Sequence, residues 1–191
     1  LSEGLYNCSK DDTMLIVLPL FHIFAMTVLM NAALYKGATS ILLPRFDAGA
    51  VLDTLEKHKV TVFAGVPTMY WGLNSYLDAN DFDISTIKSN LRMCLSGGAS
   101  LPVTVLEKFE ERFDVAILEG FGMSEGSPVV TFNQLDTGRK PGSVGTPVWG
   151  VQVKLVDADG NEVAQGEKGE LLYKGHNVMK GYYNNPKATA K

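Results

Sequence analysis

The sequence predicts an α/β fold, in which a mostly parallel βαβ sheet covered by helices is followed by a short antiparallel or barrel-like β segment. Two observations lead to this prediction. Short apolar runs alternate with helical stretches through the first two thirds of the chain, which is the pattern of parallel βαβ units. After about Gly138, glycine and proline punctuate short strand-like runs instead. We therefore expect an α/β part over residues 1–138 and a β-rich part over residues 139–191.

The first apolar run covers residues 14–34 and is long enough to suggest a membrane span. A proline, a histidine and an asparagine interrupt it, and no basic residues flank it as anchors. A strand over residues 14–18, a turn at Pro19 and a buried helix that ends at Gly37 explain the run better. We therefore expect no transmembrane span.

Four more strands are expected in the first part of the chain. Residues 40–43, 60–64, 91–95 and 115–118 are short apolar runs, and several of their residues are β-branched. Such runs suit strands of a parallel sheet that is buried on both faces.

Three helices are expected between these strands. Asp47 is a candidate N-cap for the first, which carries several apolar residues on one face. Pro67 opens the second, because proline is tolerated in the first turn of a helix. Residues 102–113 have an amphipathic pattern and form the third.

The last part of the chain reads as a hairpin. Residues 151–156 alternate apolar with polar side chains, residues 157–160 are a strong turn sequence, and residues 169–174 supply a later strand. We expect this tail to be antiparallel or barrel-like.

Composition limits the class of function. The 191 residues carry 17 Lys+Arg against 21 Asp+Glu, and this net charge of −4 argues against a nucleic-acid partner. A hydrophobic share of 46% with 20% charged residues indicates a folded globular chain. The two cysteines, Cys8 and Cys94, form neither a disulfide framework nor a CxxC metal pair. We expect a reducing location, in the cytoplasm or peripherally at a membrane, and the sequence leaves the oligomeric state open.

A glycine-rich loop, residues 96–100, follows the strand expected at residues 91–95. Ligands of α/β sheets bind at the carboxyl ends of strands, and glycine lets the backbone approach a flat ring or a phosphate. Many strand-to-helix turns contain two glycines without a ligand, so the loop alone leaves both interpretations open.

A second candidate site, residues 119–126, follows the next strand. The Ser124 hydroxyl is suited to a phosphate, the Glu125 carboxylate to a hard cation such as Mg²⁺, and the Phe121 ring to stacking on a base. The alternative is a tight turn with a capping serine and a solvated glutamate, which spacing alone favours. The motif is not the GxSxG of a nucleophile elbow, so a hydrolase is unsupported.

The three histidines show no metal-binding spacing. His22 follows the first strand in an apolar setting, where a lone histidine is usually a satisfied core residue. His58 lies near the C-terminus of a helix, where its charge favours the helix dipole. His176 belongs to a loop.

Four segments taken in order resemble the adenylate-forming (AMP-binding) superfamily. They are LPLFH at residues 18–22, SGGA at 96–99, GFGMSE at 120–125, and GELL with GHNVMKGYY within 169–183. In the same order, they resemble four segments of the family: the acyl-pocket segment, the adenine-side glycine loop, the phosphate and metal signature, and the signature near the end of the large domain. Residues 127–133 and 139–147, which follow the third segment, look most like those of bacterial long-chain fatty-acid–CoA ligases.

The resemblance implies that a carboxylic acid, here a fatty acid, is activated with MgATP to an acyl-adenylate and then transferred to coenzyme A. It implies that Ser124 hydrogen-bonds the phosphate, that Glu125 holds Mg²⁺, and that His22 lies near the reacting carboxylate. The residues that it implies around the nucleotide and the inner acyl tunnel are Gly97, Gly98, Ala99, Glu119, Gly120, Phe121, Gly122, Met123 and Ser124.

Departures from the family pattern limit these expectations. Phe121 stands where the family usually has tyrosine, which keeps the ring but loses a hydroxyl donor. The phosphate loop expected upstream, and the Thr-Gly-Asp segment and mobile C-terminal lid expected downstream, do not occur in the sequence. We therefore expect an internal fragment of the large N-terminal domain that is inactive by itself. An aryl-CoA ligase of the coumarate type and a non-catalytic nucleotide- or acyl-binding module are the alternatives.

Overall fold

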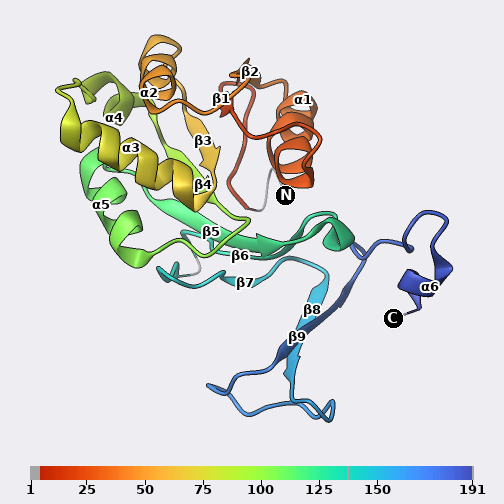
Figure 1. Cartoon of the computed structure of the whole chain (residues 1–191). Coiled ribbons are helices and arrows are strands. Elements are labelled where there is room, and N and C mark those ends of the chain that lie inside the picture. The colour runs from red at the N-terminus through yellow and green to blue at the C-terminus, as the bar shows by residue number, and fades with distance from the viewer. Residues whose placement is uncertain (1–4, 137, 191) are drawn as a thin grey trace.

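The structure, a computed structural model, describes residues 5–136 and 138–190 (Figure 1). Its elements in chain order are β1 (Thr13–Ile16), the π-helix η1 (Phe24–Asn31), α1 (Ala32–Lys36), β2 (Thr39–Leu42), α2 (Ala48–Lys57), β3 (Val62–Gly65), α3 (Pro67–Ala79), α4 (Ser85–Asn90), β4 (Met93–Ser96), α5 (Val103–Phe113), β5 (Ile117–Gly122), the short 3₁₀ helix η2 (Ser124–Gly126), β6 (Val129–Phe132), β7 (Thr146–Pro147), β8 (Val151–Val156), β9 (Glu170–Gly175) and α6 (Pro186–Thr189).

The strands of the described residues form two sheets. A seven-stranded sheet has the order β2-β1-β3-β4-β5-β6-β7, and a separate pair joins β8 to β9. Strands β1 to β5 pair in parallel, whereas β6 and β7 are antiparallel additions at one edge. This confirms the predicted class, a mostly parallel sheet with helices and a short antiparallel segment.

Helices cover both faces of the larger sheet. Alternate side chains of β1 enter two different cores: Met14 and Ile16 pack with η1 and α1, while Leu15 packs with α2 to α5. Figure 1 shows α1 on one side of the sheet and α2, α3, α4 and α5 on the other. The carboxyl ends of the central strands β4 and β5 therefore lie between two helical layers.

The helix expected before Gly37 differs in form from the prediction. It starts at Phe24, and its first eight residues are a π-helix rather than an α-helix. Gly37 ends it in the left-handed conformation with φ of 72°, as the sequence suggested. Leu34 and Tyr35 are exposed, so only one face of the helix is buried. Within the described residues, no helix is long and apolar enough to cross a membrane.

Most other elements lie close to their predicted positions. Asp47 caps α2, since its carboxylate accepts the Ala50 backbone N–H at 2.9 Å, and Pro67 is the first residue of α3. The sequence reading missed α4, which is short, mostly polar and anchored by the single buried Ile87. It also missed strand β6, which pairs with β5 on one side and β7 on the other.

The prediction that the strand expected at residues 115–118 ends before the signature was wrong. Strand β5 continues to Gly122, because Gly120 and Phe121 pair with β6 across an antiparallel ladder. The signature glycines therefore belong to a strand rather than to a free loop.

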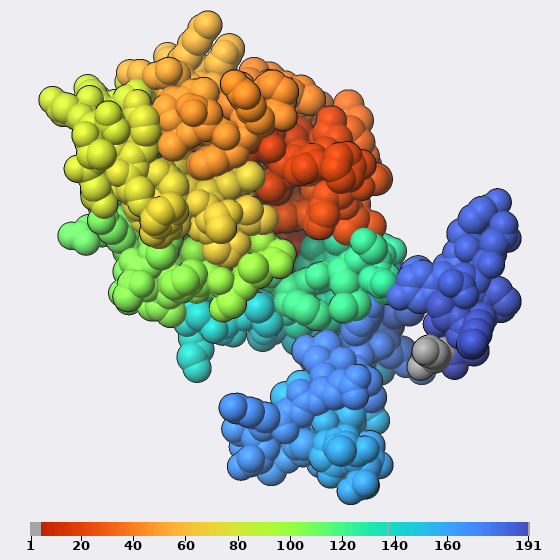
Figure 2. All heavy atoms as spheres, in the orientation of Figure 1, coloured from red at the N-terminus to blue at the C-terminus, as the bar shows by residue number. Residues whose placement is uncertain are grey.

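The second sheet is the predicted hairpin. Strands β8 and β9 pair from Val151 opposite Gly175 to Val156 opposite Glu170. The carboxylate of Asp157 accepts the backbone N–H groups of Asp159 and Asn161, both at 2.9 Å, and so closes the turn after β8. Figure 2 shows this hairpin and the C-terminal segment projecting from the body of the molecule.

Candidate active site

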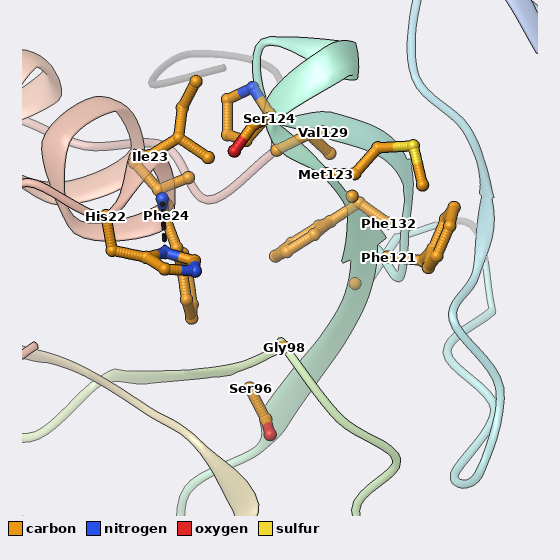
Figure 3. Close-up of a pocket in the computed structure, with 15 residues that line it drawn as sticks. His22, Ile23, Phe24, Ser96, Gly98, Phe121, Met123, Ser124, Val129 and Phe132 are labelled. Carbon is orange, nitrogen blue, oxygen red and sulfur yellow. Dashed lines mark hydrogen bonds between the residues drawn. The ribbon is translucent and has the colours of Figure 1, made fainter. Parts of the chain in front are cut away.

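Two cavities meet where β4 and β5 end. The first, of about 180 Å³, lies between the start of η1 and the β5–β6 ladder (Figure 3). The second, of about 360 Å³, is bounded by the glycine-rich loop, Glu119 and the loop at Gly142. The residues that line both cavities are Ser96, Gly98, Gly120, Phe121 and Gly122. These five residues form a wall between the two cavities, which we call the seam.

The glycines of the seam serve different purposes. A Cβ at Gly120 would lie 2.4 Å from the Phe132 ring, and one at Gly122 would lie 2.0 Å from the Pro128 carbonyl oxygen. These two glycines are therefore required by the packing of β6. Gly98 has φ of +82°, which disfavours a side chain. A Cβ at Gly97 would meet only ordinary contacts, at 3.4 Å or more, so Gly97 leaves space open in the first cavity.

Ser124 and Glu125 lie in the turn η2, directly after β5. The Ser124 side chain lines the first cavity, and Figure 3 shows it at the edge opposite the glycine-rich loop. The Glu125 carboxylate accepts a hydrogen bond of 2.6 Å from the Tyr182 hydroxyl, and this bond holds the pKa of Glu125 below its usual value. The Glu125 carboxylate thus stays ionised beside the cavity mouth.

A single carboxylate is enough for one type of metal site. Among the described residues, no three His, Cys, Asp or Glu side chains cluster as a metal cage. Mg²⁺ is usually held by one or two carboxylates together with substrate phosphates. The half-buried Glu125 beside the Ser124 hydroxyl fits a metal of that kind.

His22 lies at the rim of the first cavity and is exposed, so its interpretation as a core residue was wrong. Its Nδ1 accepts the Phe24 backbone N–H at 3.2 Å, drawn dashed in Figure 3. In a neutral ring this leaves the proton on Nε2, which can donate to a ligand oxygen.

Glu119 is a buried carboxylate in the wall of the second cavity, with 6% of its surface exposed. Burial raises its pKa, although hydrogen bonds from the Gly142 and Leu101 backbone oppose the shift. The Gly142 N–H donates to Oε2 at 2.8 Å. Nearby, the buried Ser96 hydroxyl has no partner among the described residues, so the seam holds an unused hydrogen-bonding group.

The structure brings together most of the residues expected at the site. Those that line the first cavity are His22, Gly97, Gly98, Gly120, Phe121, Gly122, Met123 and Ser124. Ala99 and Glu119 line only the second cavity. Glu125 lines neither and lies beside the first through its neighbour Ser124.

Sequence reasoning missed several site residues. Phe24 and Val28 reach the first cavity from η1, and Tyr182 reaches Glu125 from the loop after β9. Tyr182 is separated from Glu125 by 57 positions, and no periodic pattern links the two residues. For Tyr182, the only signal in the sequence was that it lies in a segment resembling a family signature.

Comparison of the chain with models of protein families shows the family to which it belongs. The model of the family described as "AMP-binding enzyme" matches residues 2–183. The chain belongs to this family. A long-chain-fatty-acid–CoA ligase of Bacillus subtilis (strain 168) is 42% identical over 175 residues, which are 91% of this chain and 30% of that protein. A feruloyl-CoA synthase of an Amycolatopsis species is 38% identical over 186 residues, or 97% of this chain and 37% of that protein.

Comparison with solved structures supports the same family. The ATP-bound crystal structure of MatB from Rhodopseudomonas palustris superposes with a TM-score of 0.89 at 31% identity, covering 99% of this chain and 36% of that one. The chain thus spans about a third of the length of the relatives that it matches. Its relatives include ligases that form acyl-CoA and aryl-CoA products.

Proposed function

We propose that this chain is the central part of the large domain of an ATP-dependent acid–CoA ligase. The enzyme adenylates a carboxylic acid and transfers the acyl group to coenzyme A. Residues 1–138 and 139–191 are the α/β and β-rich parts of that one domain, and the segment alone is inactive. A location in the cytoplasm, or peripherally at a membrane, belongs to the same proposal.

The pair of cavities on one backbone seam carries this proposal. Adenylation joins a carboxylate to the α-phosphate of a nucleotide, so the enzyme must hold two different ligands end to end. The first cavity is mainly apolar, and the second offers the Glu119 carboxylate and glycine backbone. Their shared wall, Gly98 with Gly120 to Gly122, is where the two ligands would meet.

The second cavity suits the nucleotide. An exocyclic amino group of a base can donate to the Glu119 carboxylate, whose Oε2 also accepts the Gly142 backbone N–H. The unpartnered Ser96 hydroxyl offers a further bond at the seam. The backbone of Gly97 and Gly98 allows a flat ring to approach closely.

Three side chains around the seam have the chemistry that adenylation needs. The Ser124 hydroxyl donates to a phosphate oxygen, and the Glu125 carboxylate would hold Mg²⁺ beside it. Bound there, the cation would neutralise charge that develops on the phosphate oxygens. The Nε2–H of His22 donates to the substrate carboxylate at the rim of the apolar cavity and so orients it for reaction.

The preferred substrate is a fatty acid, because the relative with 42% identity is named for long-chain fatty acids. An aromatic acid is the second candidate. The relative named for feruloyl-CoA supports it, and so does the size of the apolar cavity, about 180 Å³. This volume is below the ~300 Å³ typical of sites that enclose a whole drug-sized ligand. A long acyl chain would have to extend beyond the described part of the site.

The test compares acids in the full-length protein. Pyrophosphate release with ATP and Mg²⁺ is measured for palmitate, hexanoate and ferulate. The fatty-acid proposal expects the highest kcat/KM with palmitate. A preference for ferulate would favour the aryl-CoA ligase, and binding of ATP and acid without pyrophosphate release would favour the non-catalytic module.

A further inference from the structure

The loop after β9, residues 176–183, is hydrogen-bonded to the turn that carries Glu125. Figure 1 shows the chain leaving β9 next to η2 before it continues to α6. The Met179 N–H donates to the Glu125 carbonyl oxygen at 2.9 Å, and the Tyr182 hydroxyl donates to its carboxylate at 2.6 Å. Both the backbone and the side chain of one residue are thus held by the same loop.

Asn177 fixes the rest of the turn. Its side-chain amide donates to the carbonyl oxygens of Gly126 and Val129, both at 2.9 Å. These carbonyls lie on either side of the residues that connect η2 to β6. The turn is therefore anchored at three successive points: the residue for which we propose a metal role, the glycine after it, and the first residue of β6.

The Tyr182 bond occupies only one of the two carboxylate oxygens. The hydroxyl donates to Oε1 of Glu125, and this leaves Oε2 for another partner. A glutamate side chain at the surface has three rotatable bonds, whereas Mg²⁺ demands nearly ideal octahedral geometry. Hydrogen bonds to a ligating carboxylate fix its orientation, and losing one typically costs about 10- to 100-fold in metal affinity.

We propose that Tyr182 is a positioning residue that orients the Glu125 carboxylate for Mg²⁺, with Asn177 and Met179 holding the turn in register. This inference rests on the proposed function, which assigns the cation to Glu125. It predicts that the Tyr182 hydroxyl affects binding of the cation much more than binding of the nucleotide itself.

Tyr182→Phe in the full-length protein is the test, because it removes only the hydroxyl. The neighbouring Tyr183→Phe is the matched control, since its side chain is 93% exposed. Calorimetry measures ATP affinity with and without Mg²⁺, and kinetics give the Mg²⁺ concentration for half-maximal activity. Since Tyr182 is itself partly exposed, we expect its loss to raise that concentration by about 10-fold, with metal-free ATP affinity and kcat at saturating Mg²⁺ unchanged.

A double-mutant cycle separates positioning from simple support of the loop. If Tyr182 acts through Glu125, adding Tyr182→Phe to Glu125→Gln changes the Mg²⁺ dependence no further. Equal loss of ATP affinity with and without Mg²⁺, or Mg²⁺ dependence equal to that of Tyr183→Phe, would overturn the inference. A wild-type protein that binds ATP with no effect of Mg²⁺ would overturn the metal role of Glu125 as well, before any variant is compared.

Discussion

At the scale of single residues, the chemistry of the site depends on a few side chains held by distant partners. The Tyr182 hydroxyl and Glu125 form such a pair, as do Glu119 and the Gly142 N–H. Burial raises the pKa of Glu119, whereas the hydrogen bond lowers that of Glu125. The two carboxylates therefore suit different partners, a neutral donor in the second cavity and a cation at the mouth.

The first residue-scale prediction concerns the charge of Glu125. Glu125→Gln keeps the shape of the side chain but removes the negative charge, so adenylate formation should fall by about 30- to 1,000-fold. Kinetics at limiting and saturating Mg²⁺ measure the effect. Glu167→Gln, in an exposed part of the hairpin, is the control. Equal rates for the two variants would mean that Glu125 is a solvated turn residue.

A second residue-scale prediction concerns the acyl cavity. Gly98 is a poor site to fill because of its positive φ, whereas a Cβ at Gly97 meets the Phe24 ring at 3.5 Å without strain. Gly97→Leu should exclude part of a long acyl chain, and each lost methylene contact costs about 0.8 kcal/mol, or roughly fourfold in kcat/KM.

The measurement is kcat/KM across a series of fatty acids. Ala99→Leu is the matched control, because Ala99 lines only the second cavity. An unchanged preference for long chains in Gly97→Leu would show that the acyl group does not run beside Gly97.

At the scale of elements, the periodic patterns predicted most helices and strands because burial sets them. The cap at Asp47, the proline at the start of α3 and the left-handed Gly37 are local signals. Strand β6 has no such signal, since its partner β5 lies across a turn whose sequence was interpreted as a ligand loop. Gly120 and Gly122 line both cavities, as expected of site residues, and their close contacts with Phe132 and Pro128 are a second reason for glycine that the sequence did not reveal.

An ion pair at the amino ends of β1 and β4 gives the element-scale prediction. Burial by itself would raise the pKa of Asp12, but hydrogen bonds from Arg92, Thr61 and the Ser9 N–H outweigh it and lower the pKa to about 2. Because the folded value lies below that of an unfolded aspartate, the ionised pair stabilises the fold above about pH 4 and its contribution is lost as the pH falls towards 2.

Melting temperature measured from pH 6 to pH 2 checks this dependence. Asp12→Asn should lower stability at pH 6 by about 1–2 kcal/mol, with a smaller difference from wild type at pH 2. Asp11→Asn is the control, since this neighbour is exposed. A constant difference between Asp12→Asn and wild type at every pH would contradict the account.

At the scale of the whole molecule, the sequence predicted the order of the parts but not how they meet. Parallel strand–helix units and the final hairpin follow from local patterns. The seam between the two cavities depends on Ser96 and Gly98 lying beside Gly120, which only the sheet register brings about. Contacts between the loop after β9 and η2 likewise join segments some 50 residues apart, as Asn177 and Gly126 show with a separation of 51.

The central claim is that the enzyme containing this chain joins a carboxylate to AMP. Carboxylate-dependent exchange of labelled pyrophosphate into ATP, measured on the full-length protein without coenzyme A, tests it most directly. The account predicts exchange that requires ATP, Mg²⁺ and a carboxylic acid together, and that falls sharply in Glu125→Gln. Exchange that does not depend on the acid, or none with any fatty or aromatic acid, would contradict it.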